Sequence, residues 1–143
     1  MEHLLGAIGG ALFVWGYIWS ARRLGWESWT YAAALLALPL FYMGFALLAP
    51  ENQMALLRQE ALYGLPFFIG GVVLLMWRAP ASLYVVAGLW GLHGFYDYGH
   101  NLFFENPGVF GFYPALCTVV DVTLCIYLIT LANKQKAEAA APA

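Results

Sequence analysis

The sequence predicts an all-α membrane protein, a polytopic helix bundle of five transmembrane helices with one short interfacial helix. Of its 143 residues, 63% are hydrophobic and only 10% are charged, whereas a soluble domain carries about 25% charged residues. The mean hydropathy is +0.72. The apolar residues lie in long runs, and because a helix needs roughly 20 residues to cross a hydrocarbon core, the chain has the length for about five crossings.

The first two runs are expected to cross the membrane at residues 4–21 and 29–48. No basic region precedes the first run, which instead ends in Arg22 and Arg23. A secretory signal peptide has the opposite arrangement, so we expect a retained transmembrane helix.

The next segment is expected to start a helix at Pro50 and Glu51, since proline is tolerated in a first helical turn and an acid suits the positive helix end. Residues 51–62 mix apolar side chains with charged and amide ones. That mixture predicts an interfacial helix. A third transmembrane helix should follow over residues 62–77, with a kink at Pro66.

The last two runs predict transmembrane helices over residues 81–104 and 110–132, joined by a turn at residues 105–108. Residues 1–133 are therefore expected to form a single transmembrane helical domain. The alanine-rich residues 134–143 are expected to be a disordered cytoplasmic tail.

The basic residues predict the orientation. With the N-terminus outside, only Arg58 falls on the outer side, and the other five lysines and arginines fall inside: Arg22, Arg23, Arg78, Lys134 and Lys136. Cytoplasmic loops of membrane proteins carry such an excess of basic residues. We therefore expect an external N-terminus and a cytoplasmic C-terminus, in the inner (plasma) membrane of a bacterium.

Composition also excludes several function classes. The net charge of −2 and the lack of a basic patch exclude a nucleic-acid partner. Three histidines are too few for a histidine-box di-iron hydroxylase, and no HExxH motif of a zinc protease occurs. No CxxC redox pair occurs, and two cysteines form no disulfide framework.

Four ionisable side chains lie inside the expected transmembrane helices: His93, Asp97, His100 and Asp121. Each costs roughly 2.5–3.5 kcal/mol or more at membrane depth, so such residues indicate a functional site. At 100° per residue, the first three share one stripe of a helix. His93 and Asp121 each lie roughly 16 Å from the outer ends of adjacent antiparallel helices. The four are therefore expected to line one polar pocket that opens outward.

Two imidazoles and two carboxylates are suitable ligands for zinc or iron. His93, Asp97, His100 and Asp121 are thus candidate metal ligands, and His93, Asp97 and Asp121 are candidate catalytic residues. Two alternatives stay open. The same side chains could act without metal as a general acid and base or a proton relay, or could hold helices together through hydrogen bonds.

Other polar residues near this site are expected to have lesser roles. His3 and Glu60 are expected on the solvated outer face. Cys117 is expected level with Asp97, and buried cysteines usually act as small packing residues. Asn101 is expected either to donate a hydrogen bond to one of the site residues or to lie at the membrane interface.

The last third of the chain resembles a family of small bacterial integral membrane proteins known only as a domain of unknown function. The matching positions are Trp90, His93, Asp97, His100, Asn106, Pro107, Cys117 and Asp121. The chain departs from the pattern at Asn101, where the family usually has a second histidine. The resemblance implies a polytopic membrane protein in which these positions act together, and it implies no reaction.

The sequence therefore supports two functional hypotheses. The first is a metal-dependent membrane enzyme that acts on a lipid or another apolar small molecule within the bilayer. The second is a non-catalytic membrane protein, either a metal or proton conduit or an assembly subunit, whose buried His and Asp side chains join helices.

Overall fold

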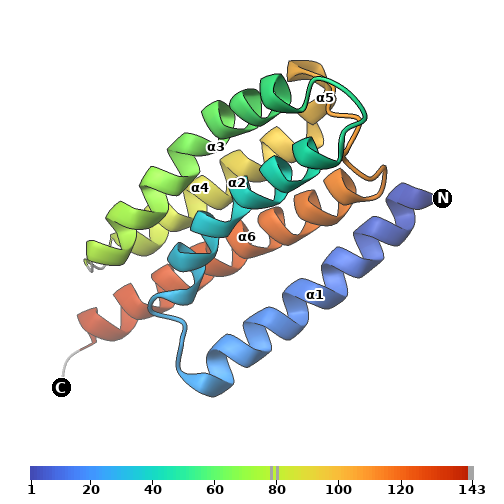
Figure 1. The fold of residues 1–143 in the computed structure, drawn as a ribbon. Coiled ribbons are helices and arrows are strands. Elements are labelled where there is room, and N and C mark those ends of the chain that lie inside the picture. The colour runs from blue at the N-terminus through green and yellow to red at the C-terminus, as the bar shows by residue number, and fades with distance from the viewer. Residues whose placement is uncertain (78, 80, 142–143) are drawn as a thin grey trace.

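The computed structural model describes residues 1–77, 79 and 81–141, which form a helix bundle (Figure 1). Four helices in it are long and apolar enough to cross a membrane: α1 (Glu2–Leu24), α2 (Thr30–Leu48), α3 (Gln53–Met76) and α6 (Tyr113–Ala140). Two are shorter: α4 (Ser82–Tyr98) and α5 (His100–Phe103). The predicted all-α fold is confirmed, with four helices, not five, that meet the length and composition of a membrane crossing.

The outer surface of the bundle is apolar. Large hydrophobic side chains point outward, for example Leu12 at 67%, Trp15 at 70% and Phe95 at 70% exposure. In water such a surface would drive aggregation, whereas lipid solvates it. Helices also satisfy their backbone hydrogen bonds internally, which a membrane requires.

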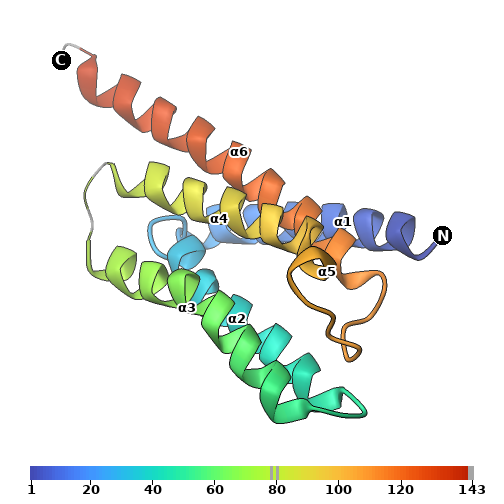
Figure 2. The same cartoon turned by 90° about the horizontal axis from the view of Figure 1, so that it is seen from above.

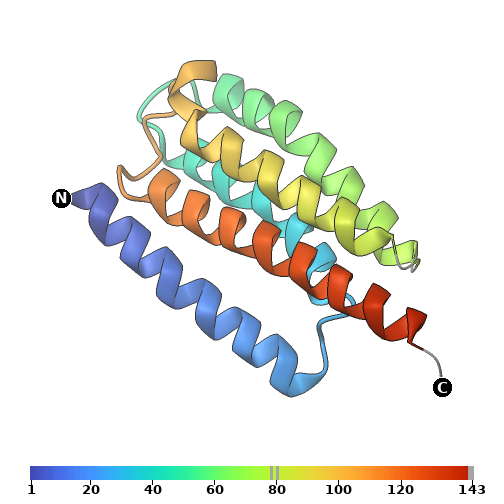
Figure 3. The same ribbon diagram turned by 180° about the vertical axis from the view of Figure 1, so that it is seen from behind.

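Four of the helices form two antiparallel pairs. α2 packs along α3, α4 packs along α6, and α1 lies beside α6 on its far side (Figures 2 and 3). The pairs contact each other less extensively, through α3 and α2 against α4. The space between the pairs is where long polar and aromatic side chains meet.

The bundle has two distinct ends (Figure 1). The α5 end holds the N-terminus, the connection at residues 49–52, and α5 itself. The basic end holds the connection at residues 25–29 and the C-terminal turns of α6. Lys134 lies at the basic end, as does Arg23. The predicted sorting of basic residues by membrane side therefore has a structural counterpart, although Arg78 lies outside the described residues.

Glycines let α1 approach α6. A Cβ added to Gly6 would collide with the carbonyl oxygen of Phe112, and one added to Gly10 with the carbonyl oxygen of Leu116. Small residues at the interface between two transmembrane helices allow such a close approach.

The interfacial helix over residues 51–62 was a wrong prediction. α3 runs without interruption from Gln53 to Met76 and includes Pro66. The physical reason is a buried stripe that continues through the whole helix: Leu56, Glu60, Gly64, Phe67, Gly71 and Leu74. Leu56 packs against Ala46 and Ala49 at the end of α2, and Glu60 contacts Tyr96 of α4, so the first turns of α3 belong to the bundle.

The start of α3 also differs from the prediction. Asn52 adopts a left-handed conformation with φ 58°, so the helix begins at Gln53 and not at Pro50. The Gln53 side-chain amide donates hydrogen bonds to the carbonyl oxygens of Leu47 and Ala49, each at 2.9 Å. These bonds satisfy carbonyls at the end of α2, which would otherwise lack partners.

The fourth predicted helix, over residues 81–104, is divided in two. α4 ends at Tyr98 with 17 residues, and α5 begins after Gly99. Gly99 lies at the break, with φ −98° and ψ 11°, away from the α-helical values. The predicted turn follows, and the Gly108 amide donates to Asn106 Oδ1 at 3.1 Å.

The C-terminal tail is helical where disorder was predicted for residues 134–143. α6 continues to Ala140, while residues 142–143 lie outside the described residues. Alanine, lysine, glutamine and glutamate are all good helix formers. Lys134 Nζ also lies 3.7 Å from Glu138 Oε1, one turn further along.

Candidate functional site

Three of the four predicted site residues meet in the bundle interior. His93 and Asp97 lie one turn apart on α4, and Asp121 faces them from α6. Their exposures are 2%, 0% and 1%, so all three are excluded from solvent. We call this group the His–Asp triad.

One nitrogen of His93 faces both carboxylates. Its Nδ1 lies 2.8 Å from Asp121 Oδ2 and 3.1 Å from Asp97 Oδ2. One potential ligand atom from each side chain lies within 4.8 Å of the others. The contact with Asp121 agrees with the matched depths of these residues on neighbouring helices.

Close helix packing brings the triad together. A Cβ on Gly94 would lie 3.0 Å from Asp121 Cβ, and one on Gly91 would lie 3.1 Å from Cys125 Sγ. Both distances are shorter than ordinary packing allows. Glycine at these two positions of α4 therefore sets the distance between His93 and Asp121.

The triad leaves oxygen atoms without partners. Among the described residues, Asp97 Oδ1, Asp97 Oδ2 and Asp121 Oδ1 are buried and accept no hydrogen bond, although His93 Nδ1 lies 3.1 Å from Asp97 Oδ2. A proton on His93 Nδ1 can point at only one of the two carboxylates, and the shorter contact is the one with Asp121. Buried polar atoms are normally paired, so the triad has unused capacity to bind a cation or protons.

A second buried polar group surrounds Glu60 of α3. Its Oε1 accepts hydrogen bonds from Asn106 Nδ2 at 2.7 Å and His100 Nε2 at 3.2 Å. Its Oε2 accepts one from the Tyr96 hydroxyl at 3.1 Å. We call these four residues the Glu60 cluster. The prediction of a solvated Glu60 was wrong, since this side chain is only 1% exposed.

His100 is therefore separated from the other predicted ligands. The break at Gly99 ends the helical stripe on which His93, Asp97 and His100 were expected to align. The Nε2 atom of His100 faces Glu60, while its Nδ1 has no partner among the described residues.

Tyr42 of α2 lies between the two groups. Its ring stacks on His100, with centroids 4.7 Å apart and an interplanar angle of 15°, and it lies 6.5 Å from the His93 ring. Its buried hydroxyl has no hydrogen-bond partner in the described part of the chain. Tyr42 is therefore a residue of α2 that belongs to the site. The sequence did not predict this, because nothing around Tyr42 distinguishes it from the other tyrosines in the apolar segments.

The predicted pocket that opens outward is not what the structure shows. Every member of the His–Asp triad is at most 2% exposed. Two surface pockets occur elsewhere, one lined by residues that include Glu27 and Lys136, and one by residues that include Trp15 and Arg22. No triad residue lines either of them.

The remaining candidates lie around the site as follows. Cys117 is buried at 7% exposure on the same helix as Asp121, one turn earlier. His3 and Asn101 are both exposed, so neither belongs to the triad or to the Glu60 cluster.

Comparisons of the chain with protein-family models, with curated proteins and with solved structures found no match.

Proposed function

We propose that this protein is an integral membrane protein that binds one divalent metal ion, zinc or iron, at His93, Asp97 and Asp121. The observation that carries the proposal is the convergence of these three side chains, with three buried carboxylate oxygens that have no hydrogen-bond partner in the described part of the chain. Nitrogen and oxygen ligands of this kind suit both metals.

The charges of the triad side chains support the binding of a divalent cation. Two carboxylates that face each other away from water repel one another, and each is costly to bury alone. One divalent ion with two aspartates and a neutral imidazole has no net charge, which suits a low-dielectric interior. Binding would therefore stabilise the fold as well as equip it chemically.

Three protein ligands leave a coordination position for water or substrate, as in catalytic zinc sites. Because the triad lies among apolar helices, the substrate would be a lipid or another apolar small molecule. His93, Asp97 and Asp121 would hold the metal, and a carboxylate oxygen of Asp97 or Asp121 that is not bound to it would accept a proton from the bound water or substrate.

A second candidate function rests on the direct 2.8 Å contact between His93 Nδ1 and Asp121 Oδ2. This hydrogen bond joins α4 to α6 without any metal. In that case the triad is a proton relay or a contact that holds the helices together.

Metal analysis separates the two candidates. Protein purified in detergent should contain close to one zinc or iron per chain, and His93→Gln and Asp121→Asn should each lose it. The matched control is His3→Gln, because His3 is exposed. A chelator should lower the melting temperature of the native protein but not that of His93→Gln. A metal-free, chelator-insensitive native protein would favour the second candidate.

We further propose that the protein crosses a bacterial inner membrane five times, through α4 as well as the four long helices α1, α2, α3 and α6. The basic end, which holds Arg23 and Lys134, would face the cytoplasm. A reporter inserted at Asn52 should be external, and one fused after Lys136 should be cytoplasmic. The opposite result at either position would contradict this topology.

A further inference from the structure

The contact between α1 and α6 changes along its length. Near the α5 end the two helices touch through Gly6 and Gly10. Nearer the basic end the small residues give way to bulky ones, and Gly16 has nothing within 4 Å of an added Cβ. Here α1 and α6 border a pocket of about 680 Å³, lined by Trp15, Ile18, Trp19, Arg22, Arg23 and Tyr127. We call it the α1–α6 groove.

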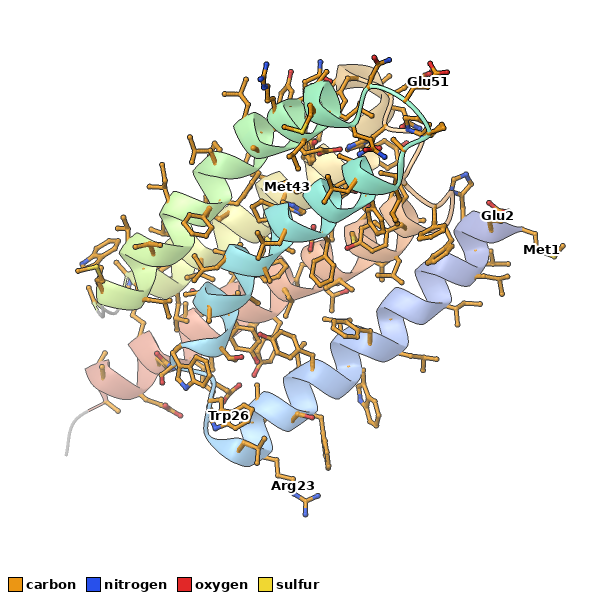
Figure 4. All side chains as sticks on the ribbon, viewed as in Figure 1. Met1, Glu2, Arg23, Trp26, Met43 and Glu51 are labelled. Carbon is orange, nitrogen blue, oxygen red and sulfur yellow. The ribbon has the colours of Figure 1, made fainter. Side chains whose placement is uncertain are left out.

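Two guanidinium groups mark one end of the groove. Arg22 and Arg23 are exposed in the last turn of α1, and neither forms an ion pair with a residue that the structure describes. The Arg23 guanidinium carbon lies 5.0 Å above the Trp19 ring, and the side chain extends away from the bundle (Figure 4). Guanidinium groups bind phosphate through paired hydrogen bonds.

The rest of the groove is apolar. Trp15 is 70% exposed and Trp19 is 50% exposed, so their rings are available to a ligand. From Trp15 to Arg23 the helix rises roughly 12 Å at 1.5 Å per residue. That length matches a phosphate headgroup followed by the first part of an acyl chain.

No acid forms an ion pair with either arginine among the described residues. Glu27 follows α1, and its carboxylate accepts a hydrogen bond from the Tyr127 hydroxyl. Glu27 lines the other surface pocket and not the α1–α6 groove. This carboxylate lies at the edge of the groove, because Tyr127 lines it. Arg22 and Arg23 form no ion pair with a described residue, so the groove presents two positive charges beside exposed aromatic rings.

We propose that the α1–α6 groove binds one anionic phospholipid, with its phosphate at Arg22 and Arg23 and an acyl chain along Trp15 and Trp19. Basic pockets between transmembrane helices bind anionic lipid headgroups, and tryptophan favours the headgroup region. The inference depends on the chain lying in a membrane and is independent of the metal proposal.

The test is native mass spectrometry of the full chain titrated with phosphatidylglycerol or phosphatidylcholine. The native protein should prefer one phosphatidylglycerol by about tenfold. Arg22→Gln/Arg23→Gln should lose this preference. Arg22→Lys/Arg23→Lys keeps the charge that sets membrane orientation and should retain part of it. The matched control is Arg58→Gln, since Arg58 lies on α3 near the α5 end and should not affect lipid choice.

Three outcomes would overturn the proposal. One is equal binding of the two lipids by the native protein, and another is a preference that Arg22→Gln/Arg23→Gln retains while its helicity is native. A third is displacement of the lipid by millimolar glycerol phosphate, which would show a site for a soluble anion. A dimer whose formation excludes lipid would assign the groove to a second copy of the chain and would also contradict it.

Discussion

The His–Asp triad and the Glu60 cluster lie side by side in the same bundle and differ in how their carboxylates are paired. In the Glu60 cluster one carboxylate accepts three hydrogen bonds, from Tyr96, His100 and Asn106. In the triad two carboxylates share one imidazole nitrogen, and three of their oxygens have no partner among the described residues.

This difference separates two uses of a buried acid. A carboxylate surrounded by donors is satisfied by the fold, so the Glu60 cluster connects α3 to α5 and to the loop that follows α5. Two carboxylates with one donor are not satisfied by the fold, so the triad needs a cation or protons to complete it. Neutralising an acid should therefore have opposite effects in the two groups.

The largest expected effect on stability is at Glu60. Glu60→Ala leaves three buried donors without their acceptor and should lower the free energy of unfolding by about 3–5 kcal/mol. Denaturant-induced unfolding in detergent micelles measures this loss. Glu51→Ala is the matched control, because Glu51 is exposed. If the two variants were equally stable, the Glu60 cluster would not connect the helices.

The second largest effect on stability is expected where α4 packs closely against α6. Gly94→Ala places a methyl group against Asp121 and should destabilise the protein by about 1–3 kcal/mol. It should also weaken metal binding. Gly88→Ala serves as the control, since nothing lies within 4 Å of a Cβ there. That variant should be neutral or gain up to about 1 kcal/mol, and equal losses in the two variants would argue against close packing at the triad.

A smaller change in the free energy of unfolding, an increase in place of a decrease, is expected for a substitution at Asp97. Asp97→Asn removes one of two facing carboxylates and should stabilise the metal-free protein by about 1 kcal/mol. The same variant should bind no metal. Glu60→Gln should instead lose stability, because the amide has only one acceptor oxygen and cannot accept all three hydrogen bonds. Thermal unfolding with chelator present measures both, and a destabilised Asp97→Asn would remove the contrast between the two groups.

The smallest effect on stability is expected for an ion pair that belongs to neither the His–Asp triad nor the Glu60 cluster. Lys134 and Glu138 are 68% and 64% exposed, and their coupling in a double-mutant cycle should be only about 0.3–0.5 kcal/mol. A coupling several times larger would show that the end of α6 is held in a way that this ion pair does not explain.

Much of the fold could be predicted from the sequence because bilayer thickness ties helix length to the length of an apolar run. The runs located α1, α2 and α6, and the short turn made α4 and α6 antiparallel neighbours. Helix boundaries depended on local details that composition does not contain. Asn52 delays the start of α3, and Gly99 ends α4 early.

The triad was predictable because sequence spacing fixes relative depth in neighbouring helices. Glu60 was missed because its segment contains other charged residues and was interpreted as interfacial. A signal was present, since Leu56, Glu60 and Gly64 follow one another at intervals of four and continue the buried stripe of α3. The partners of Glu60 come from later in the chain, and no local pattern indicates them.

The central claim is that His93, Asp97 and Asp121 bind a metal ion, and X-ray absorption spectroscopy of the purified native protein tests it most directly. We expect a zinc or iron edge with nitrogen and oxygen neighbours at about 2.0–2.2 Å and no sulfur. The signal should disappear in His93→Gln and persist in His3→Gln. A shell that contains sulfur at about 2.3 Å, or a folded native protein with no metal edge, would contradict the claim.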